Sequence, residues 1–240
     1  MSAPQHAFLT NRDMILILGA MKSVIRSGAL QNYQTLVQAL GGDSWELLRR
    51  NNINPDALRN PETPISLTST IHLLEETAAA TQCPDFGLRL SGYQNTETLG
   101  TLAIVIQSSA NLAQAVTDAS RYLFLHSPAY EIVLDQHSAL FHDCVALRFG
   151  IRLPEFIQQR QIIDGCLGLI YRIGRLLSAR QFSLRGVSLP HTPIADESVY
   201  RRYFGVPVHF AQPYAALHVH RDVLQTDLKA VTPALRQLAL

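Results

Sequence analysis

The residues best suited to chemistry lie in one oily segment, residues 155–178, which is predicted to form a long helix. Between Ile162 and Ile173 this segment is apolar on almost every side, and Asp164 is the one acidic residue in that run. A carboxylate buried in such a helix needs a partner charge or several hydrogen bonds. Asp164 is therefore predicted either to face a pocket and bind a cationic or hydroxyl-bearing ligand, or to pair with Arg160 or an arginine of a neighbouring element.

Two other polar side chains share the helical stripe of Asp164. Gln161, Asp164, Gly168 and Tyr171 follow one another at i, i+3, i+7 and i+10, which places them along one side of a helix. Gln161 and Tyr171 are therefore candidates to bind the same ligand. Gly165 and Gly168 weaken helix formation, but a glycine also lets another backbone or a ligand come close.

A second group of candidates surrounds the point where the chain passes from helices to strands. Tyr122, Phe124, His126 and Tyr130 lie there. Aromatic rings with polar tips at such a junction suit a small-molecule pocket. The alternative for Tyr122 and Phe124 is ordinary packing in the core, which is also the interpretation of the single tryptophan, Trp45.

Three histidines near the end of the chain raise the question of a metal site. His218 and His220 share one face of a predicted strand, and His209 lies on the strand before it. No carboxylate or cysteine of matching spacing accompanies them, so the alternative is a solvent-facing polar side of an edge strand. The sequence also lacks a Gly-x-Ser-x-Gly elbow, a phosphate-binding glycine loop and an HExxH motif. No catalytic residue, metal ion or cofactor is therefore expected.

The elements that must position these residues change character at Pro128. Residues 10–127 carry helical periodicity, and residues 96–128 are predicted to form two helices joined by a Ser-rich turn. Asn111 is predicted to cap the second of these helices, because its side chain can accept a hydrogen bond from the first turn.

Residues 128–221 instead alternate apolar and polar side chains, which predicts strands on either side of the long helix. The alternation changes phase at Arg185 and Gly186, where a β-bulge is predicted. The predicted fold class is α+β. An N-terminal helical half (10–127) precedes an antiparallel sheet of about five strands covered by the long helix (128–221).

Composition narrows the possible partners and compartment. The chain of 240 residues has a formal net charge of +1, which gives no general attraction to nucleic acid or to an anionic membrane. Cys83, Cys144 and Cys166 show neither disulfide nor zinc spacing, which favours a cytoplasmic protein. The N-terminus lacks the order of a signal peptide, and its apolar run MILILGAM is too short to span a bilayer.

Three stretches resemble successive motifs of one protein family. They are NPDALRNPETPISLTSTIHLLEETAAATQCPDFGLRLS (54–91), LGTLAIVIQSSANLAQAVTDASRYLFL (99–125) and FSLRGVSLPHTPIADESVYRRYFGVPVHF (182–210). The second resembles a signature of a Leu-Gly-x-Leu helix, a Ser-rich turn and an Ala-rich helix ending in Arg-Tyr. This signature is found in the effector-sensing N-terminal domain of AraC-type bacterial transcription regulators, and the three stretches follow in that family's order.

The resemblance implies an effector-sensing and dimerisation domain over residues 1–225. Residues 226–240 would begin a linker to a DNA-binding domain with two helix-turn-helix units, which the chain does not contain. The implied partners are a small-molecule effector, a second copy of the chain, and promoter DNA only through the missing domain, with no membrane partner. Family effectors include amines and amino acids. The family offers no short ligand motif, so the pocket residues named above rest on pattern alone.

Two other functions stay open beside this ligand-sensing domain. The chain could be a small-molecule enzyme with an apolar pocket, in which Asp164, His126 and Tyr171 would be the acid–base candidates. It could also be a pairing module without a ligand, which predicts a filled interior. The missing catalytic constellation weighs against the enzyme.

Overall fold

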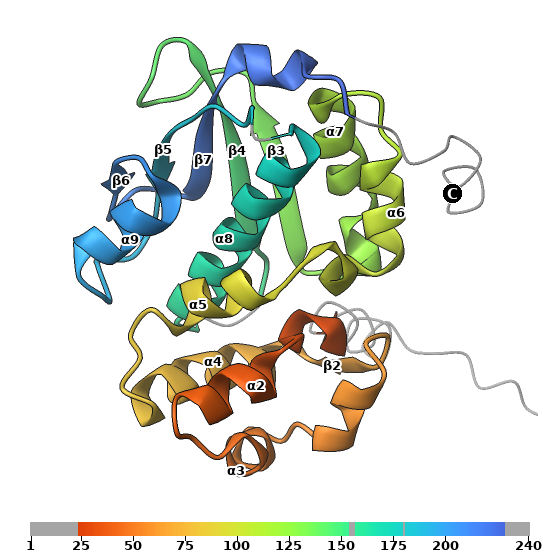
Figure 1. The fold of residues 1–240 in the computed structure, drawn as a ribbon, viewed down its shortest axis with the longest axis vertical. Coiled ribbons are helices and arrows are strands. Elements are labelled where there is room, and N and C mark those ends of the chain that lie inside the picture. Colours follow the sequence, from red (N-terminus) through yellow and green to blue (C-terminus); the bar gives the residue numbers. More distant parts are fainter. Residues whose placement is uncertain (1–23, 154–156, 180, 229–240) are drawn as a thin grey trace, which may run out of the picture.

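The computed structural model describes residues 24–153, 157–179 and 181–228, which form a helical body beside a sheet-containing body (Figure 1). The helical body also contains a two-stranded antiparallel sheet. Its elements are β1 (Val24–Arg26), α2 (Tyr33–Ala39), α3 (Ser44–Arg50), β2 (Pro64–Ser66) and α4 (Leu67–Ala80). The expected start of the helical half, residues 10–23, and residues 229–240 of the expected linker lie outside the described residues.

The second body is built on a five-stranded sheet in the order β3-β4-β7-β5-β6. The strands are β3 (Tyr130–Asp135), β4 (Cys144–Ile151), β5 (Leu184–Ser188), β6 (Val208–His209) and β7 (Ala215–His220). The predicted α+β class is confirmed, but the sheet is mixed, since β5 and β6 run parallel. The helix α9 (Glu197–Phe204) lies between them in the chain, and such a crossover returns the chain in the same direction.

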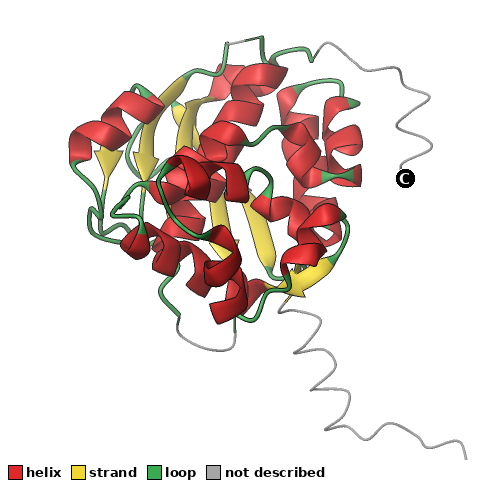
Figure 2. Ribbon diagram, turned by 60° about the horizontal axis from the view of Figure 1, so that its bottom comes forward, coloured by secondary structure: helices red, strands yellow, loops and turns green. Residues whose placement is uncertain are grey.

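Helices lie over one face of this sheet (Figures 1 and 2). They are α6 (Thr101–Gln107), α7 (Leu112–Tyr122), α8 (Arg160–Leu177) and α9, and α5 (Phe86–Tyr93) lies between the two bodies. The predicted cap of α7 is confirmed, because the Asn111 side chain accepts from the backbone N–H of Gln114 at 2.9 Å. The predicted bulge is confirmed too, since the pairing of β5 with β7 shifts between Leu184 and Gly186.

Helix α8 begins five residues later than the sequence predicts, at Arg160. The carboxylate of Glu75 on α4 accepts from the backbone N–H of Gln161 at 3.0 Å and from the Arg160 guanidinium at 2.9 Å. An acidic side chain at a helix N-terminus satisfies free N–H groups and suits the helix dipole. A tertiary contact with α4 therefore determines where α8 starts.

The close approach of α5 to α8 joins the two bodies. A Cβ atom added to Gly87 on α5 would lie 2.0 Å from the carbonyl oxygen of Gln161, and one added to Gly165 would lie 3.2 Å from the carbonyl oxygen of Gly87. The expectation that a glycine of the long helix allows a close backbone contact is thus confirmed. Trp45, by contrast, is 52% exposed, so its assignment to the core was wrong.

Within the described ranges, no helix has the length and apolar character needed to cross a membrane.

The contact of Gly87 with α8 makes a prediction about stability. Gly87→Ala places a methyl group against a backbone carbonyl and should lower the free energy of unfolding by about 3 kcal/mol or more. Gly150→Ala is the matched control, because nothing lies within 4 Å of the added Cβ, and its effect should stay below about 1 kcal/mol. Urea denaturation of both variants measures the difference, and equal stability would contradict the close packing.

Candidate functional site

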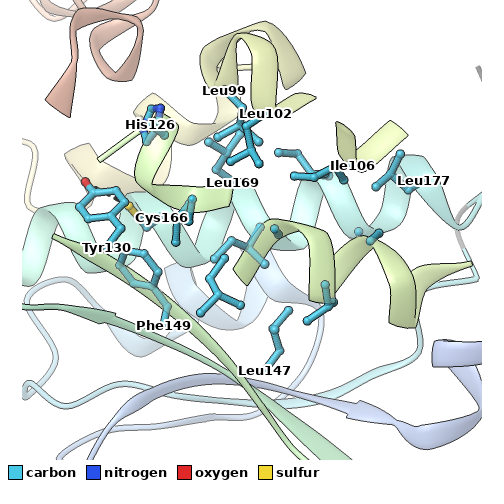
Figure 3. A pocket seen from close by; sticks show the side chains of 18 of the residues that line it. Leu99, Leu102, Ile106, His126, Tyr130, Leu147, Phe149, Cys166, Leu169 and Leu177 are labelled. Carbon is cyan, nitrogen blue, oxygen red and sulfur yellow. Dashed lines mark hydrogen bonds between the residues drawn. The ribbon is translucent and has the colours of Figure 1, made fainter. Parts of the chain in front are cut away.

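A cavity of about 100 Å³ lies between the sheet and three helices, α6, α7 and α8 (Figure 3). Its floor includes Leu147 and Phe149 of β4, and its roof includes Ile106 of α6 and Ala119 of α7. Leu169 of α8 closes one side. The cavity is therefore lined by elements from both halves of the sequence.

Small side chains leave this space open. Ala115 and Ala119 follow at i and i+4, so both lie on the inner face of α7, where they are buried. Gly174 of α8 also lines the cavity, but the Phe182 ring takes the place of its missing side chain, 2.5 Å from an added Cβ. The two alanine side chains are too short to fill the space beneath α7.

The polar end of the cavity is formed by three residues, His126, Tyr130 and Cys166. Figure 3 shows His126 and Tyr130 at one end of the lining and Leu177 at the other. The centroids of the His126 and Tyr130 rings are 5.8 Å apart, and the Cys166 thiol donates weakly to the Tyr130 hydroxyl at an S–O distance of 3.8 Å. The same three residues also line an adjoining space of about 40 Å³, so the two spaces meet at this corner.

The corner is uncharged at neutral pH. Burial, with a smaller effect of the nearby Arg26 charge, lowers the pKa of His126 to about 4. Burial also raises the pKa of Tyr130 well above its ordinary value and that of Cys166 to about 12. His126 is 5% exposed, and its Nδ1 has no hydrogen-bond partner among the described residues. The corner therefore offers neutral hydrogen-bonding groups, one of them unpaired.

Asp164, the leading candidate from the sequence, does not line this cavity. Its Oδ1 lies 3.0 Å from His191 Nε2, and its Oδ2 accepts from the Tyr200 hydroxyl at 2.8 Å. Both carboxylate oxygens are bonded, and Asp164 is 1% exposed. The carboxylate therefore lies buried where α8 contacts α9 and the segment before α9. The predicted pair with Arg160 is wrong, because Arg160 bonds Glu75 instead.

Burial and mutual attraction have opposite effects on the pKa values of Asp164 and His191. Burial opposes the charge of His191, but the hydrogen bond and negative charge of Asp164 prevail and raise the pKa of His191 above its usual value. Burial raises the pKa of Asp164, although His191 and Tyr200 oppose that rise. The pair is thus a buried contact between elements, with no atom of Asp164 left for a ligand.

The other sequence candidates divide between cavity and core. Gln161 lines the adjoining smaller space, and its amide is engaged, accepting from Gly87 N–H at 2.7 Å and donating to Pro84 C=O at 2.8 Å. Tyr171 is buried beside the rings of Phe182 and Phe204, with centroids 6.1 and 5.6 Å away.

The remaining two aromatic candidates lie outside the cavity lining. Tyr122 is half-buried and packs against the core, whereas Phe124 is 56% exposed. Of the seven predicted residues, the structure thus places His126 and Tyr130 at the cavity and Gln161 next to it.

Most of the cavity wall was missed by sequence reasoning. Residues such as Ile106, Leu147 and Phe149 are apolar, and their periodicity is the same whether they pack against a side chain or border a space. The signal that could have found the site is the pair Ala115 and Ala119 on the inner face of an otherwise well-packed helix.

The histidines at the end of the chain do not gather around a metal position. His218 is fully buried on β7, a central strand, with Nδ1 2.8 Å from Ser138 Oγ and Nε2 2.7 Å from Ser188 Oγ. Its predicted place on a solvent-facing edge strand is wrong. In the part of the chain that the structure describes, no three His, Cys, Asp or Glu side chains are grouped so that they could hold a metal ion.

Two buried neutral histidines predict a loss of stability in acid. Burial lowers the pKa of His126 and of His218 to about 4, with Arg26 and His209 adding to the effect respectively. Their ordinary pKa in the unfolded chain is about 6.5. A lowered folded pKa contributes stability above about pH 6.5 that is lost as the pH falls toward 4. Each histidine should add up to about 1.4 kcal/mol per pH unit to the fall.

Urea unfolding across that pH window measures this slope. His126→Gln should remove one histidine's share of the fall, whereas His137→Gln should keep the parent profile because His137 is exposed. A slope unchanged by His126→Gln would show that this ring is not held neutral in the folded state.

The sequence is similar to that of known transcription regulators. Residues 41–228 match the family described as the arabinose-binding domain of AraC transcription regulator, N-term. The HTH-type transcriptional regulator VirS of Mycobacterium tuberculosis is 29% identical over 219 residues, which cover 90% of this chain and 63% of VirS. The ornithine utilization regulator of Pseudomonas aeruginosa is 26% identical over 205 residues, which cover 85% of this chain and 59% of that regulator.

One solved structure has a similar fold. It is the crystal structure of the transcriptional regulator CdpR from Pseudomonas aeruginosa, with a TM-score of 0.59, 19% sequence identity, and coverage of 84% of this chain and 60% of CdpR. The chain thus spans less than two thirds of each of these relatives. Because the matched region takes up most of its length, the chain belongs to the arabinose-binding-domain family of AraC transcription regulators.

Proposed function

We propose that the chain is the effector-sensing part of a transcription regulator and that its effector binds in the cavity between α7, α8 and the sheet. The observation that supports this most is the cavity itself, with the unpaired His126 at its polar end. A ligand there would contact α6 and α7 from the helical half and β3 and β4 from the sheet. Small-molecule sites are enclosed, mostly apolar and carry few polar groups, as this one does.

Residues 226–228, which would follow the proposed sensing domain, are hydrogen-bonded to the turn before α7. Thr226 C=O accepts from Leu112 N–H at 3.2 Å, and Leu228 N–H donates to Ala110 C=O at 3.0 Å. A β-bridge joins Asn111 and Asp227. Leu112 also lines the cavity. The turn at residues 110–112 therefore contacts both the cavity and residues 226–228. It supplies a short route from the effector to the rest of the regulator.

The effector must distinguish two states of this turn. A ligand shifts a conformational equilibrium only through unequal affinity for the two states. A ligand that fills the space beneath α7 favours the arrangement in which α7 is held in place. The bridge from the start of α7 to residues 226–228 is then held in place too. We propose that the rest of the regulator responds to this fixation.

The partners and compartment follow from the family. Two of the relatives are named as an HTH-type transcriptional regulator and an ornithine utilization regulator. We propose that promoter DNA is bound by a segment outside this chain, that residues 1–225 sense and dimerise, and that the regulator acts in the cytoplasm. The net charge of +1 suits a part that does not itself hold DNA.

The alternative of an enzyme finds less support in the structure. Asp164 is engaged by His191 and Tyr200 away from the cavity, whereas His126 lies at the cavity. Of the three proposed acid–base residues, Asp164 and His126 therefore do not share a site. The relatives are regulators, which favours sensing over turnover.

A cavity-filling variant tests where the effector binds. In a thermal-shift screen of benzyl alcohol, benzoate, benzylamine and ornithine, a compound that binds the folded chain raises its melting temperature. Ala119→Leu occupies the cavity and should abolish that rise. Ala79→Leu on α4 adds the same atoms at an exposed position and should keep it. A rise that survives Ala119→Leu would place the site elsewhere, and no rise with any compound would count against sensing by this cavity.

Hydrogen exchange tests the route to the exit. The amides of Leu112 and Leu228 form the hydrogen bonds between the α7 turn and residues 226–228. A bound compound from the screen should slow their exchange, because it stabilises the closed arrangement against local opening. The amide of Leu48, bonded within the helical body, is the reference. Equal change at all sites, or none at Leu112 and Leu228, would contradict this route.

A further inference from the structure

On the basis of the proposed function, we infer that the effector is an uncharged alcohol or phenol, about as large as one six-membered ring, whose hydroxyl binds at His126 and Tyr130. Three properties of the cavity support this: its charge, its size, and the hydrogen-bonding groups at one end.

The cavity excludes charged ligands. None of the residues that line it within the described chain is Asp, Glu, Lys or Arg. Moving a single charge out of water without a partner costs several kcal/mol or more. An amine would find no carboxylate, and a carboxylate would find no cation facing it.

Arg26, whose charge acts on His126, is already engaged. Its Nε donates to Glu62 at 2.8 Å, and a second nitrogen pairs with the other oxygen of the same carboxylate. A third nitrogen donates to the carbonyl oxygen of Thr98 at 3.0 Å. Arg26 does not line the cavity, and its charge is compensated by Glu62. It is therefore not available to neutralise an anionic ligand.

The volume of the cavity fits a small ligand. An engineered protein cavity of about 150 Å³ lined by Leu, Ile and Phe binds benzene. The cavity here is of the same order, about 100 Å³, and its walls are of the same kind. A single ring or a short chain fits after slight adjustment of the side chains. A long diamino acid such as ornithine is both too polar and too highly charged for these walls.

The polar corner calls for one hydroxyl group. His126 Nδ1 is buried without a partner among the described residues, and the Tyr130 hydroxyl has only a weak contact with the Cys166 thiol at 3.8 Å there. An unpaired buried polar group costs about 1–3 kcal/mol. A ligand hydroxyl both donates and accepts, so it can pair with the neutral imidazole and the phenol together. A hydrocarbon would leave His126 Nδ1 unpaired.

The test compares four probes that share one ring: benzyl alcohol, benzoate, benzylamine and toluene. Titration calorimetry with the full chain at neutral pH should give the tightest binding for benzyl alcohol, by at least about tenfold over either charged probe. Toluene should bind more weakly than benzyl alcohol. Tyr130→Phe should shrink the advantage of benzyl alcohol over toluene by about tenfold, since it removes one hydrogen bond and keeps the ring.

Tyr122→Phe is the matched control, because it removes a phenol hydroxyl from a residue that does not line the cavity. It should leave the ranking and affinities unchanged. If benzoate or benzylamine binds as tightly as benzyl alcohol, and Ala119→Leu abolishes that binding, the cavity is the effector site but the neutral-ligand inference is wrong. Equal binding of toluene and benzyl alcohol overturns the hydroxyl. If none of the four binds, or Ala119→Leu leaves binding intact, the inference fails together with the proposed site.

Discussion

The structure depends on the burial of one helix, α8. Its contacts with α5, α9 and α7 differ from one another. At Gly87 and Gly165 the backbones of α5 and α8 come so close that neither position has room for a side chain without movement. On the side of α9, the Asp164 carboxylate is bonded by His191 and Tyr200. On the side of α7, the small side chains of Ala115 and Ala119 leave a cavity in place of a close contact.

This arrangement explains why the cavity can persist in a well-packed protein. An empty apolar space lowers stability by an amount that grows with its volume. Here the surrounding walls are fixed by contacts that do not involve the cavity, such as Gln161 with Gly87 and Glu75 with the start of α8. Collapse of α7 onto α8 would also disturb the bridge between Asn111 and Asp227. The cavity and residues 226–228 thus share the turn before α7.

Local features of the sequence predicted local structure well. The Asn111 cap, the bulge near Gly186 and the α+β class depend on short-range periodicity and hydrogen bonding, which the sequence carries directly. The start of α8 and the parallel pairing of β6 depend on tertiary contacts, and these were predicted incorrectly.

The site shows the same division between local and tertiary information. His126 and Tyr130 were found because aromatic and polar tips at a junction are visible in a sequence. Asp164 was the stronger signal, but a buried acid signals only that it needs partners, and the fold supplied His191 and Tyr200. The apolar walls carry no distinguishing mark, since a leucine beside a space has the same neighbours in sequence as one in solid core.

We expect a neutral ring to occupy the space beneath α7 with its oxygen at His126 and Tyr130. A crystal structure of this chain grown with benzyl alcohol measures this directly. We expect density for the ring between Ala119 and Leu147, with the hydroxyl within hydrogen-bonding distance of His126 or Tyr130. Density for the alcohol elsewhere, with side chains closing the space between α7 and α8, would contradict it.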